Sequence, residues 1–251
     1  MKPKKKHNYC LVIPVINEGD RISKLIRRIY DNKIFELADT IIVDGGSDDG
    51  SLDLNNLKKY NVTALLVKKD SGKLSAQLRC AYSFAINEGY AGIITIDGND
   101  KDDPKAIPAF IDQLNNGIDF IQASRFIKGG VSKNLPLSRY LAVRMIHAPL
   151  LSIFSGFYWT DTTQGFRAYS RKILLDPKVA PFRKIFMNYE LLAYLSYRVP
   201  KLGFKCIELP TSRKYPKGNT PTKISSFSGN SSVLFSLLKA CFGFYNPTKN
   251  V

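Results

Sequence analysis

The sequence predicts a single α/β domain built on a mostly parallel β-sheet with helices on both faces. Two observations lead to this fold class. Short apolar runs alternate with segments of helical periodicity four to five times along the first part of the chain, an alternation that is typical of parallel sheets. The two halves are joined without a linker rich in Gly, Ser and Pro. The second half is therefore expected to cover the open edge of the sheet rather than to form a separate domain.

Apolar runs bounded by turn residues predict the strands, and apolar positions three and four residues apart predict the helices. The first strand is expected at residues 9–16, an apolar run that includes Pro14, and the first helix at residues 18–32. Further strands are expected at residues 40–43, 62–69, 90–97, 118–126 and 204–212. Further helices are expected at residues 52–60, 73–89, 104–117, 138–157 and 184–199.

The two ends of the chain are set apart from the predicted domain, which spans residues 9–228. Residues 1–8 form a basic tail without the apolar core of a signal peptide. Residues 229–251 are expected to form an amphipathic helix and a tail. Its apolar face would carry Val233, Leu234, Leu237, Leu238, Cys241, Phe242 and Tyr245, and its polar face mainly Ser232, Ser236, Lys239 and Gly243. The apolar face either lies on an anionic membrane or packs on the domain or on the second subunit of a homodimer.

The chain is strongly basic, with 37 Lys and Arg against 21 Asp and Glu and a formal net charge of +16. Such a charge attracts nucleic acid, anionic membranes and phosphorylated small molecules. The sequence has no helix-turn-helix, RNP or zinc pattern, so we do not expect nucleic acid as a partner. The four cysteines are scattered, and the apolar stretches are shorter than the about 20 residues that cross a bilayer. We therefore expect a cytoplasmic protein that is at most peripheral on the inner face of the membrane.

A concentrated group of carboxylates follows one predicted strand, in the stretch TIDGNDKDDP at residues 95–104. Asp97 and Asn99 are two residues apart, and in an extended segment they point to the same side. Their oxygens suit Mg²⁺ or Mn²⁺, since Mg²⁺ sites use one or two protein carboxylates plus water and substrate phosphates. The alternative is a simple turn, because Asp, Gly and Asn are all turn residues. Asp102 and Asp103 are expected to begin the next helix.

A second acidic loop begins at Asp44, which ends a predicted strand before GGSDDGS. Its carboxylate could accept hydrogen bonds from a nucleobase, or the loop could be only a tight turn and helix cap. The GxxxxGK[ST] and GxGxxG patterns are absent, which argues against an ATPase and a dinucleotide-binding protein. Polar loops at residues 14–20, 44–51 and 97–104 all follow predicted parallel strands. Ligands bind at that edge of such sheets, so we expect the three loops to converge.

Five motifs follow one another along the chain. They are VIPVINEGDRI at 12–22, IIVDGGSDDGS at 41–51, ITIDGNDKDDP at 94–104, QASRF at 122–126 and DTTQGFRAYSRKIL at 161–174. In this order they resemble the motifs of glycosyltransferase family 2, in its dolichol- or polyprenyl-phosphate sugar synthase-like branch. The resemblance runs from about residue 9 to about residue 225. It implies the GT-A fold, in which a Rossmann-like sheet is flanked by helices.

The resemblance also implies a function: metal-dependent transfer of a sugar, with inversion, from a nucleoside diphosphate sugar to polyprenyl phosphate or a lipid-linked glycan. It assigns nucleotide binding to Pro14, Asn17, Glu18, Asp44 and Lys73, and metal binding to Asp97 and Asn99. It assigns phosphate or acceptor binding to Arg125, Arg167, Arg213 and Lys223. Asp161 and Glu190 are the two candidates for a general base. A phosphate acceptor, already ionised at neutral pH, would need no base.

Three departures from the family pattern keep other functions open. Asn99 replaces the second Asp of the DxD motif, so Asp100 or a water is expected to compensate. Gly45 replaces one Asp of the VDDGS motif, and the membrane-spanning C-terminal helices of some relatives are not found. The alternatives are transfer to a soluble or surface-polysaccharide glycan, and a basic protein that binds a sugar nucleotide or nucleic acid without catalysis.

Overall fold

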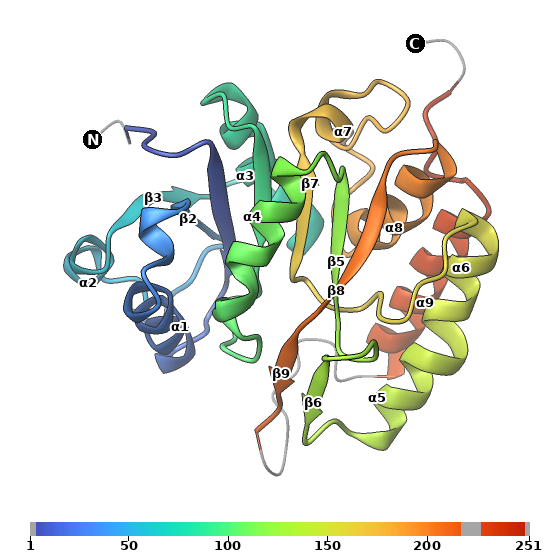
Figure 1. Ribbon diagram of the computed structural model, residues 1–251, viewed down its shortest axis with the longest axis horizontal. Helices are drawn as coiled ribbons and strands as arrows, with labels where there is room; N and C mark the ends of the chain where they lie inside the picture. The colour runs from blue at the N-terminus through green and yellow to red at the C-terminus, as the bar shows by residue number, and fades with distance from the viewer. Residues whose placement is uncertain (1–3, 217–226, 249–251) are drawn as a thin grey trace.

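A seven-stranded sheet forms the centre of the protein, whose computed structural model describes residues 4–216 and 227–248 (Figure 1). The strands lie in the order β3-β2-β1-β4-β7-β5-β8. Their bounds are Tyr9–Val15 (β1), Asp39–Asp44 (β2), Val62–Val67 (β3), Gly92–Thr95 (β4), Phe120–Ser124 (β5), Arg167–Ser170 (β7) and Cys206–Pro210 (β8). Neighbouring strands run parallel except for β7, which is antiparallel to both β4 and β5. The predicted α/β domain with a mostly parallel sheet is confirmed.

Helices cover both faces of this sheet (Figure 1). On one face lie α1 (Asp20–Asp31) and α4 (Ile107–Asn115), and on the other α3 (Leu74–Asn87) and α8 (Glu190–Lys201). The other helices are α2 (Leu54–Lys59), α5 (Leu137–Leu141), α6 (Ala148–Ser155), α7 (Arg171–Leu175) and α9 (Phe227–Cys241). Two short 3-10 turns are η1 (Ile34–Glu36) and η2 (Pro104–Ala106), and the π-helical η3 (Ala142–His147) joins α5 to α6.

Strand β1 explains why the first apolar run predicts a buried strand. Leu11, Ile13 and Val15 belong to the core beneath α1 and α4. Cys10 and Val12 belong to the core beneath α3 and α8. Successive side chains of a strand point to opposite faces, so a strand that is covered on both faces needs apolar residues at every position.

Strand β7 is a feature that the sequence does not predict. It has four residues, begins with a charged side chain and lies inside the segment that resembles a family motif. Because β7 is antiparallel, its first residue, Arg167, pairs with Thr95 of β4 and with Gln122 of β5. The segment that precedes β7 is thereby delivered to the carboxyl edge of the parallel strands, where ligands bind in such sheets.

Two predicted boundaries are wrong. The strand expected at 204–212 is divided in two: β8 ends at Pro210, and β9 (Ser212–Lys214) pairs with β6 (Val131–Lys133) in a separate two-stranded sheet. The helix expected at 184–199 begins only at Glu190, because residues 184–189 run irregularly past the start of α3.

The C-terminal helix α9 packs on α8 and α6. Leu237, Ala240 and Cys241 are buried there, which supports the alternative that the helix packs on the domain. Leu234 and Phe242, predicted on the same face, are nevertheless exposed. Within residues 4–216 and 227–248, no helix combines the length and the apolar character that a membrane-spanning segment needs.

Candidate active site

The loops that follow β1 and β2 are joined by side-chain hydrogen bonds. Asn17 Nδ2 donates to Asp48 Oδ1 at 2.8 Å, and the backbone N–H of Asp48 donates to Asn17 Oδ1 at 3.0 Å. Asn17 has a φ of 48°, a left-handed conformation that Asn adopts more readily than most residues. The loop after β4 joins them, because a Cβ at Gly98 would lie 2.9 Å from the carbonyl oxygen of Pro14. The predicted convergence of the three loops is present.

Asp44 is held in a fixed orientation at the end of β2. Its Oδ1 accepts from the N–H groups of Gly46 and Ser47 at 3.1 and 2.9 Å and from Ser47 Oγ at 2.7 Å. These three bonds leave Oδ2 unused, and the residue is nearly buried. The loop is thus a tight turn, as one alternative predicts, and it still offers a carboxylate oxygen whose direction is fixed before any ligand binds.

Gln77 of α3 explains why Gly45 stands where the family motif has a second Asp. The Nε2 of Gln77 donates to the carbonyls of Val15 and Val43 at 2.7 and 2.6 Å and so ties β1 to β2. A Cβ at Gly45 would already lie 3.3 Å from that nitrogen. A longer side chain would crowd the amide, so this buried bridge favours glycine.

The carboxylate of Asp97 lies between Gly165 and Arg213. A Cβ at Gly165 would lie 2.0 Å from Asp97 Oδ1, so a side chain at position 165 would displace the carboxylate. Arg213 Nη2 lies 3.2 Å from Asp97 Oδ2. The two neighbours come from distant parts of the chain, one from the loop before β7 and the other from β9. Asp97 therefore lies next to a fixed positive charge, and its Oδ1 lies against the backbone of Gly165, which has no side chain.

Asp102 and Asp103 have different roles. Asp103 caps η2 and accepts from the N–H of Lys105 at 3.2 Å, as predicted for the start of a helix. Asp102 does not belong to the helix start. It is buried, and its Oδ2 lies 2.5 Å from Arg213 Nη1. Burial raises the pKa of Asp102 to about 6, although the charge of Arg213 opposes that rise.

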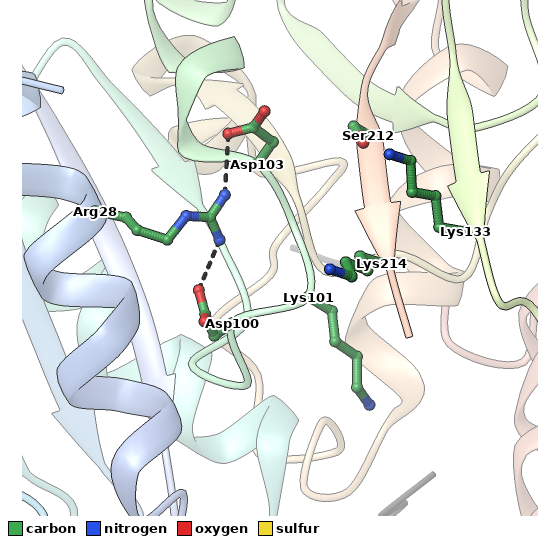
Figure 2. Close-up of a pocket in the computed structure, with 7 residues that line it drawn as sticks. All are labelled: Arg28, Asp100, Lys101, Asp103, Lys133, Ser212 and Lys214. Carbon is green, nitrogen blue, oxygen red and sulfur yellow. Dashed lines mark hydrogen bonds and ion pairs between the residues drawn. The ribbon is translucent and has the colours of Figure 1, made fainter. Parts of the chain in front are cut away.

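Asp100 is engaged in an ion pair away from Asp97. Its Oδ1 lies 2.7 Å from Arg28 Nη1, and Arg28 Nη2 lies 3.1 Å from Asp103 Oδ1 (Figure 2). Asn99 Oδ1 accepts from the N–H of Lys101 at 3.3 Å. Nothing in this arrangement supports the expectation that Asp100 makes up for the missing second Asp.

The Arg28 bridge forms one side of a cavity of about 350 Å³ (Figure 2). Lys101, Lys133 and Lys214 line it as well. The cavity is therefore rich in positive charge, which suits an anionic ligand.

Tyr215 lies at the centre of several positive charges. Lys101 Nζ and the guanidinium carbons of Arg139 and Arg213 lie 5.6, 5.6 and 5.7 Å from its ring centroid. Arg125 Nη1 donates to its hydroxyl. Burial, together with the charges of Arg213 and Arg139, lowers the pKa of Lys101 to about 8. An anion bound beside Asp97 would offset this repulsion.

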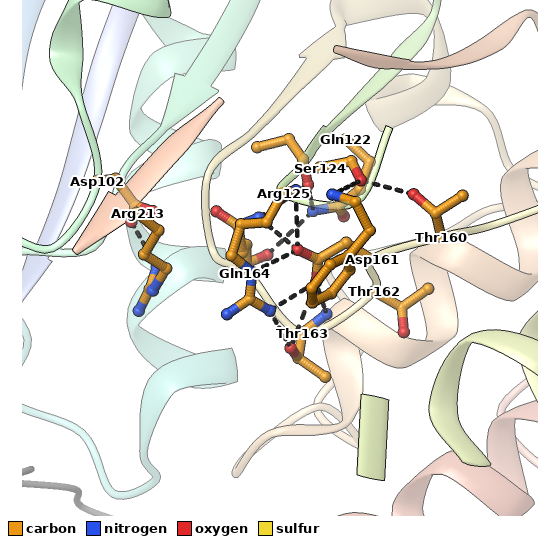
Figure 3. Close-up of polar contacts among 12 residues, drawn as sticks. Asp102, Gln122, Ser124, Arg125, Thr160, Asp161, Thr162, Thr163, Gln164 and Arg213 are labelled. Atoms are coloured by element: carbon orange, nitrogen blue, oxygen red, sulfur yellow. Dashed lines mark hydrogen bonds and ion pairs between the residues drawn. The ribbon is translucent and has the colours of Figure 1, made fainter. Parts of the chain in front are cut away.

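Asp161 and Arg125 form a buried, two-pronged ion pair (Figure 3). Arg125 Nε lies 2.6 Å from Asp161 Oδ2, and Arg125 Nη2 lies 2.9 Å from Asp161 Oδ1. Gln164 Nε2 also donates to Asp161 Oδ2, at 2.6 Å, and Asp161 is fully buried. Both carboxylate oxygens thus accept hydrogen bonds from protein side chains. Neither faces a position where it could take a proton from an acceptor.

Arg167 is fully buried. Its guanidinium donates to the carbonyls of Thr162 and Leu192 at 2.7 and 2.8 Å and to Ser196 Oγ at 3.0 Å. It thereby locks the loop before β7 to α8, and it does not reach the cavity as a phosphate-binding residue would. Lys223, the remaining predicted phosphate-binding residue, lies outside the described residues.

Glu190 and Lys73 lie at two neighbouring helix starts, those of α8 and α3. Glu190 Oε2 accepts from the N–H of Asn188 at 2.7 Å, at the start of α8. The backbone N–H of Lys73 donates to the carbonyl of Met187 at 2.7 Å, and Lys73 Nζ lies 5.9 Å from the Tyr189 ring. The segment just before Glu190 thus lies against the backbone at Lys73. Glu18, two residues before α1, pairs with Arg21 of its first turn at 2.9 Å.

The protein groups around Asp97 suit a divalent ion that takes most of its ligands from the substrate phosphates. Among the described residues, no group of three or more His, Cys, Asp or Glu side chains is placed to hold a metal ion. Mg²⁺, however, needs only one or two protein carboxylates when substrate phosphates supply the other oxygens. Asp97 supplies the one carboxylate that this lower requirement needs. Residues 98–100 form a turn rather than the expected extended segment, and Asn99 Oδ1 accepts from the N–H of Lys101 there.

The sequence did not predict several residues that shape this site: Gln77, Lys101, Gly165, Glu208 and Tyr215. Gly165 carried a signal, since it stands inside the GFR motif. Glu208 accepts from Thr160 and Asp161 N–H groups, both at 2.9 Å, and so anchors the loop that holds Asp161. Nothing in the sequence around Glu208, in the short strand β8, or around Tyr215, just after β9, distinguishes these two residues from their neighbours.

Comparisons with known proteins agree with this geometry. Residues 10–176 match the family model described as glycosyl transferase family 2. The chain belongs to that family. The predicted family, its GT-A fold and glycosyltransferase activity are therefore confirmed.

Curated relatives match most of the chain. The dolichyl-phosphate hexose transferase of Haloferax volcanii is 27% identical over 241 residues, which cover 92% of this chain and 93% of that protein. The polyprenol monophosphomannose synthase of Mycolicibacterium smegmatis is 23% identical over 205 residues, which cover 80% and 75%. A solved structure of glucosyl-3-phosphoglycerate synthase from Mycobacterium tuberculosis, in complex with Mn²⁺, uridine diphosphate and glucosyl-3-phosphoglycerate, has a TM-score of 0.61 at 16% identity. That likeness covers 97% of this chain and 82% of the other, and it shows the shared fold.

Proposed function

We propose that this glycosyltransferase moves a sugar from a nucleoside diphosphate sugar to a lipid-linked acceptor, a polyprenyl phosphate or a lipid-linked glycan, with inversion at the anomeric carbon. The observation that carries the proposal is the position of Asp97, whose carboxylate lies beside Arg213 and against Gly165 at the edge where the Asp44 loop also lies. This arrangement offers a place for a diphosphate between the sugar and the nucleoside.

The donor would lie along this edge. Asp44 Oδ2 would accept from the base, and Pro14, Asn17, Glu18 and Lys73 would line the rest of the nucleoside pocket. In the transfer, the bond between the anomeric carbon and the diphosphate oxygen breaks while the acceptor oxygen bonds to that carbon from the opposite side. Negative charge grows on the leaving oxygen, and fixed cations aimed at it lower the barrier.

Asp97, with Asn99, would hold Mg²⁺ or Mn²⁺ against the donor diphosphate. When bound, the ion would neutralise phosphate charge and act as a Lewis acid on the leaving oxygen. Arg213 contributes a second, permanent positive charge at the same place. Its ion pairs with Asp97 and Asp102 hold the guanidinium in position, so little reorganisation is needed as charge develops.

A lipid-linked acceptor is supported by the names of the relatives, which include a dolichyl-phosphate hexose transferase and an undecaprenyl-phosphate 4-deoxy-4-formamido-L-arabinose transferase. It also fits the cations around Tyr215 and the lysines of the cavity. Such an acceptor would place the enzyme at a membrane surface, peripheral on the side where nucleotide sugars are available.

A phosphate acceptor is also consistent with the state of the two candidate bases. Asp161 is engaged by Arg125 and Gln164, so we assign it and Arg125 a positioning role, and we assign Arg167 the same. Glu190 stays the candidate base for a hydroxyl acceptor. If the acceptor is a phosphate, Glu190→Gln should leave transfer within about threefold of wild type, since no proton must be removed. Transfer to a glycan that is abolished by this change would assign the base to Glu190.

The experiment that tests the function is a transfer assay with a set of nucleoside diphosphate sugars and polyprenyl phosphate, with and without a chelator. We expect a glycosylated lipid, restored by added Mg²⁺ or Mn²⁺, whose anomeric configuration is opposite to that of the donor. Nucleotide binding without transfer to any lipid or glycan acceptor would support a binding protein instead. Transfer to a soluble glycan alone would replace the proposed acceptor.

A further inference from the structure

Carboxylates are absent from two segments of the chain. None of the 21 Asp and Glu residues lies within 120–160 or 209–251. The first segment nevertheless contains Arg125, Lys128, Lys133, Arg139 and Arg144, and the second contains Arg213, Lys214, Lys217, Lys223, Lys239 and Lys249. Most of the net positive charge of the protein therefore comes from these two segments.

The two segments lie side by side in the fold. In the first, α5, η3 and α6 follow one another from Leu137 to Ser155, and in the second α9 packs against α6 (Figure 1). The rings of Phe154 and Phe242 meet with centroids 5.1 Å apart. The strands β6 and β9 pair with each other as well. The described parts of these segments that lie outside the central sheet, α5 to α6 with α9 and β6 with β9, are thus neighbours in the fold.

Large apolar side chains are exposed on these neighbouring segments. Leu137, Met145, Ile153 and Tyr158 are 71–75% exposed. Tyr140, Leu141 and Ile146 add to them on the first segment, and Leu234, Phe235, Phe242 and Phe244 on the second. Scattered single apolar residues are normal on a protein surface, but a group of this size marks an interaction site. We call this set of residues the apolar flank.

The apolar flank begins beside the candidate active site. Arg139 of α5 lies two residues after Leu137, and its guanidinium is 5.6 Å from the Tyr215 ring. Tyr215 in turn contacts Arg213, which pairs with Asp97. A bound lipid could therefore place its charged head near these cations while its chain extends along the apolar flank.

We propose that the apolar flank docks on the surface of an anionic lipid bilayer, with α5, η3, α6 and the outer side of α9 lying in the interface. The segments that carry these exposed apolar residues contribute cations that reach the surface, such as Lys128, Arg139 and Arg144, and contribute no carboxylate. This combination matches the two requirements of such binding, apolar burial and attraction to anionic headgroups. This placement deepens the proposed function, because it would bring a lipid-linked acceptor to the site. It differs from docking through α9 alone, since the inner side of α9 is already buried on the domain.

Flotation of the full chain with vesicles tests the proposal. At physiological salt, we expect the protein to float with vesicles of phosphatidylcholine and phosphatidylglycerol in equal parts and to float much less with phosphatidylcholine alone. Higher salt should weaken binding, because screening reduces the headgroup attraction. A wild-type protein that does not float with the anionic vesicles overturns the proposal.

Variants of exposed residues identify the surface that docks. The double change Met145→Asp and Ile153→Asp should lower partition onto anionic vesicles by about tenfold or more, since it removes apolar burial and adds negative charge. The matched control is Leu54→Asp with Leu175→Asp, which alters exposed leucines of α2 and α7 and should float as wild type does. Equal flotation of the first variant and wild type would refute docking through this side.

Two further measurements separate this proposal from others. The Met145→Asp and Ile153→Asp variant should keep wild-type transfer to a short, water-soluble prenyl phosphate and lose transfer to a long-chain acceptor in vesicles. If wild type floats but glycosylates no prenyl phosphate, docking stands and the proposed acceptor fails. If wild type is a dimer in light scattering and the variant a monomer that floats like wild type, the apolar flank is a subunit interface and the docking proposal is wrong.

Discussion

The two sides of the candidate site use their carboxylates in opposite ways. In the loops after β1 and β2, the nearly buried Asp44 accepts hydrogen bonds from backbone N–H groups and a serine hydroxyl, and the exposed Asp48 accepts from the amide of Asn17. On the other side, Asp102 and Asp161 are buried and each holds an arginine. The first kind of carboxylate shapes a loop for a ligand. The second kind fixes the position of a positive charge, and its loss leaves that charge buried without a partner.

The largest expected effect is on stability, from Asp161→Ala. Removing one partner of a buried ion pair costs about 3–5 kcal/mol, because the other charge stays desolvated. Urea denaturation should show the loss as a lower midpoint. The double change Arg125→Met with Asp161→Leu should recover most of it, since no buried charge remains. A midpoint for Asp161→Ala that equals wild type would contradict the positioning role.

The next effect, from Asp97→Ala, is on transfer. We expect the rate to fall by roughly 100-fold or more, as when one group that stabilises the transition state is lost. In a titration with Mn²⁺, the variant should need a higher Mn²⁺ concentration than wild type to reach half of its maximal rate. The control is Asp103→Ala, which removes a nearby carboxylate that caps η2 and pairs with Arg28, and which should cost about 1 kcal/mol of stability. Wild-type activity and metal dependence in the Asp97 variant would exclude the metal role.

Gly165→Ala should lower transfer although it removes no functional group. Its Cβ would occupy space within 2.0 Å of Asp97 Oδ1, so the carboxylate must move. Small misplacements of reacting groups cost large factors in rate, and we expect a loss of about tenfold or more together with weaker apparent metal affinity. Kinetics at several Mn²⁺ concentrations would measure both, and an unchanged metal affinity would speak against the arrangement.

The smallest effect is expected from Asp44→Ala, which tests the loop side of the comparison. Nucleotide affinity should fall by about tenfold, the worth of one hydrogen bond to a charged group. The midpoint of unfolding should barely change, because a strand-end loop contributes little to the core. Ser47→Ala, which removes only one of the three bonds that orient the carboxylate, should have a smaller effect. Calorimetry decides, and an unchanged affinity for Asp44→Ala would exclude contact with the nucleotide.

The local sequence was sufficient to predict the parallel half of the fold and the loops of the site. Strand β1 is apolar at almost every position because it is covered on both faces. The loops after β1, β2 and β4 are recognisable because turns and capping require Gly, Asn, Asp and Ser. Asp44 and Asp97 were located in this way, since both directly follow apolar strands whose carboxyl ends share one edge.

Only the tertiary structure decided which carboxylates are available to a ligand. Asp161 and Asp97 both stand in family motifs, yet Asp161 is enclosed by Arg125 and Gln164, whereas Asp97 pairs with Arg213 through one oxygen and has the other against Gly165. The partners of Asp161 and Asp102 are 36 and 111 residues away along the chain, and β7, too short to predict, brings the first pair together. Whether a carboxylate is buried and paired depends on such long-range contacts. Burying an unpaired charge is costly, so a carboxylate is buried only where the fold brings a partner to it.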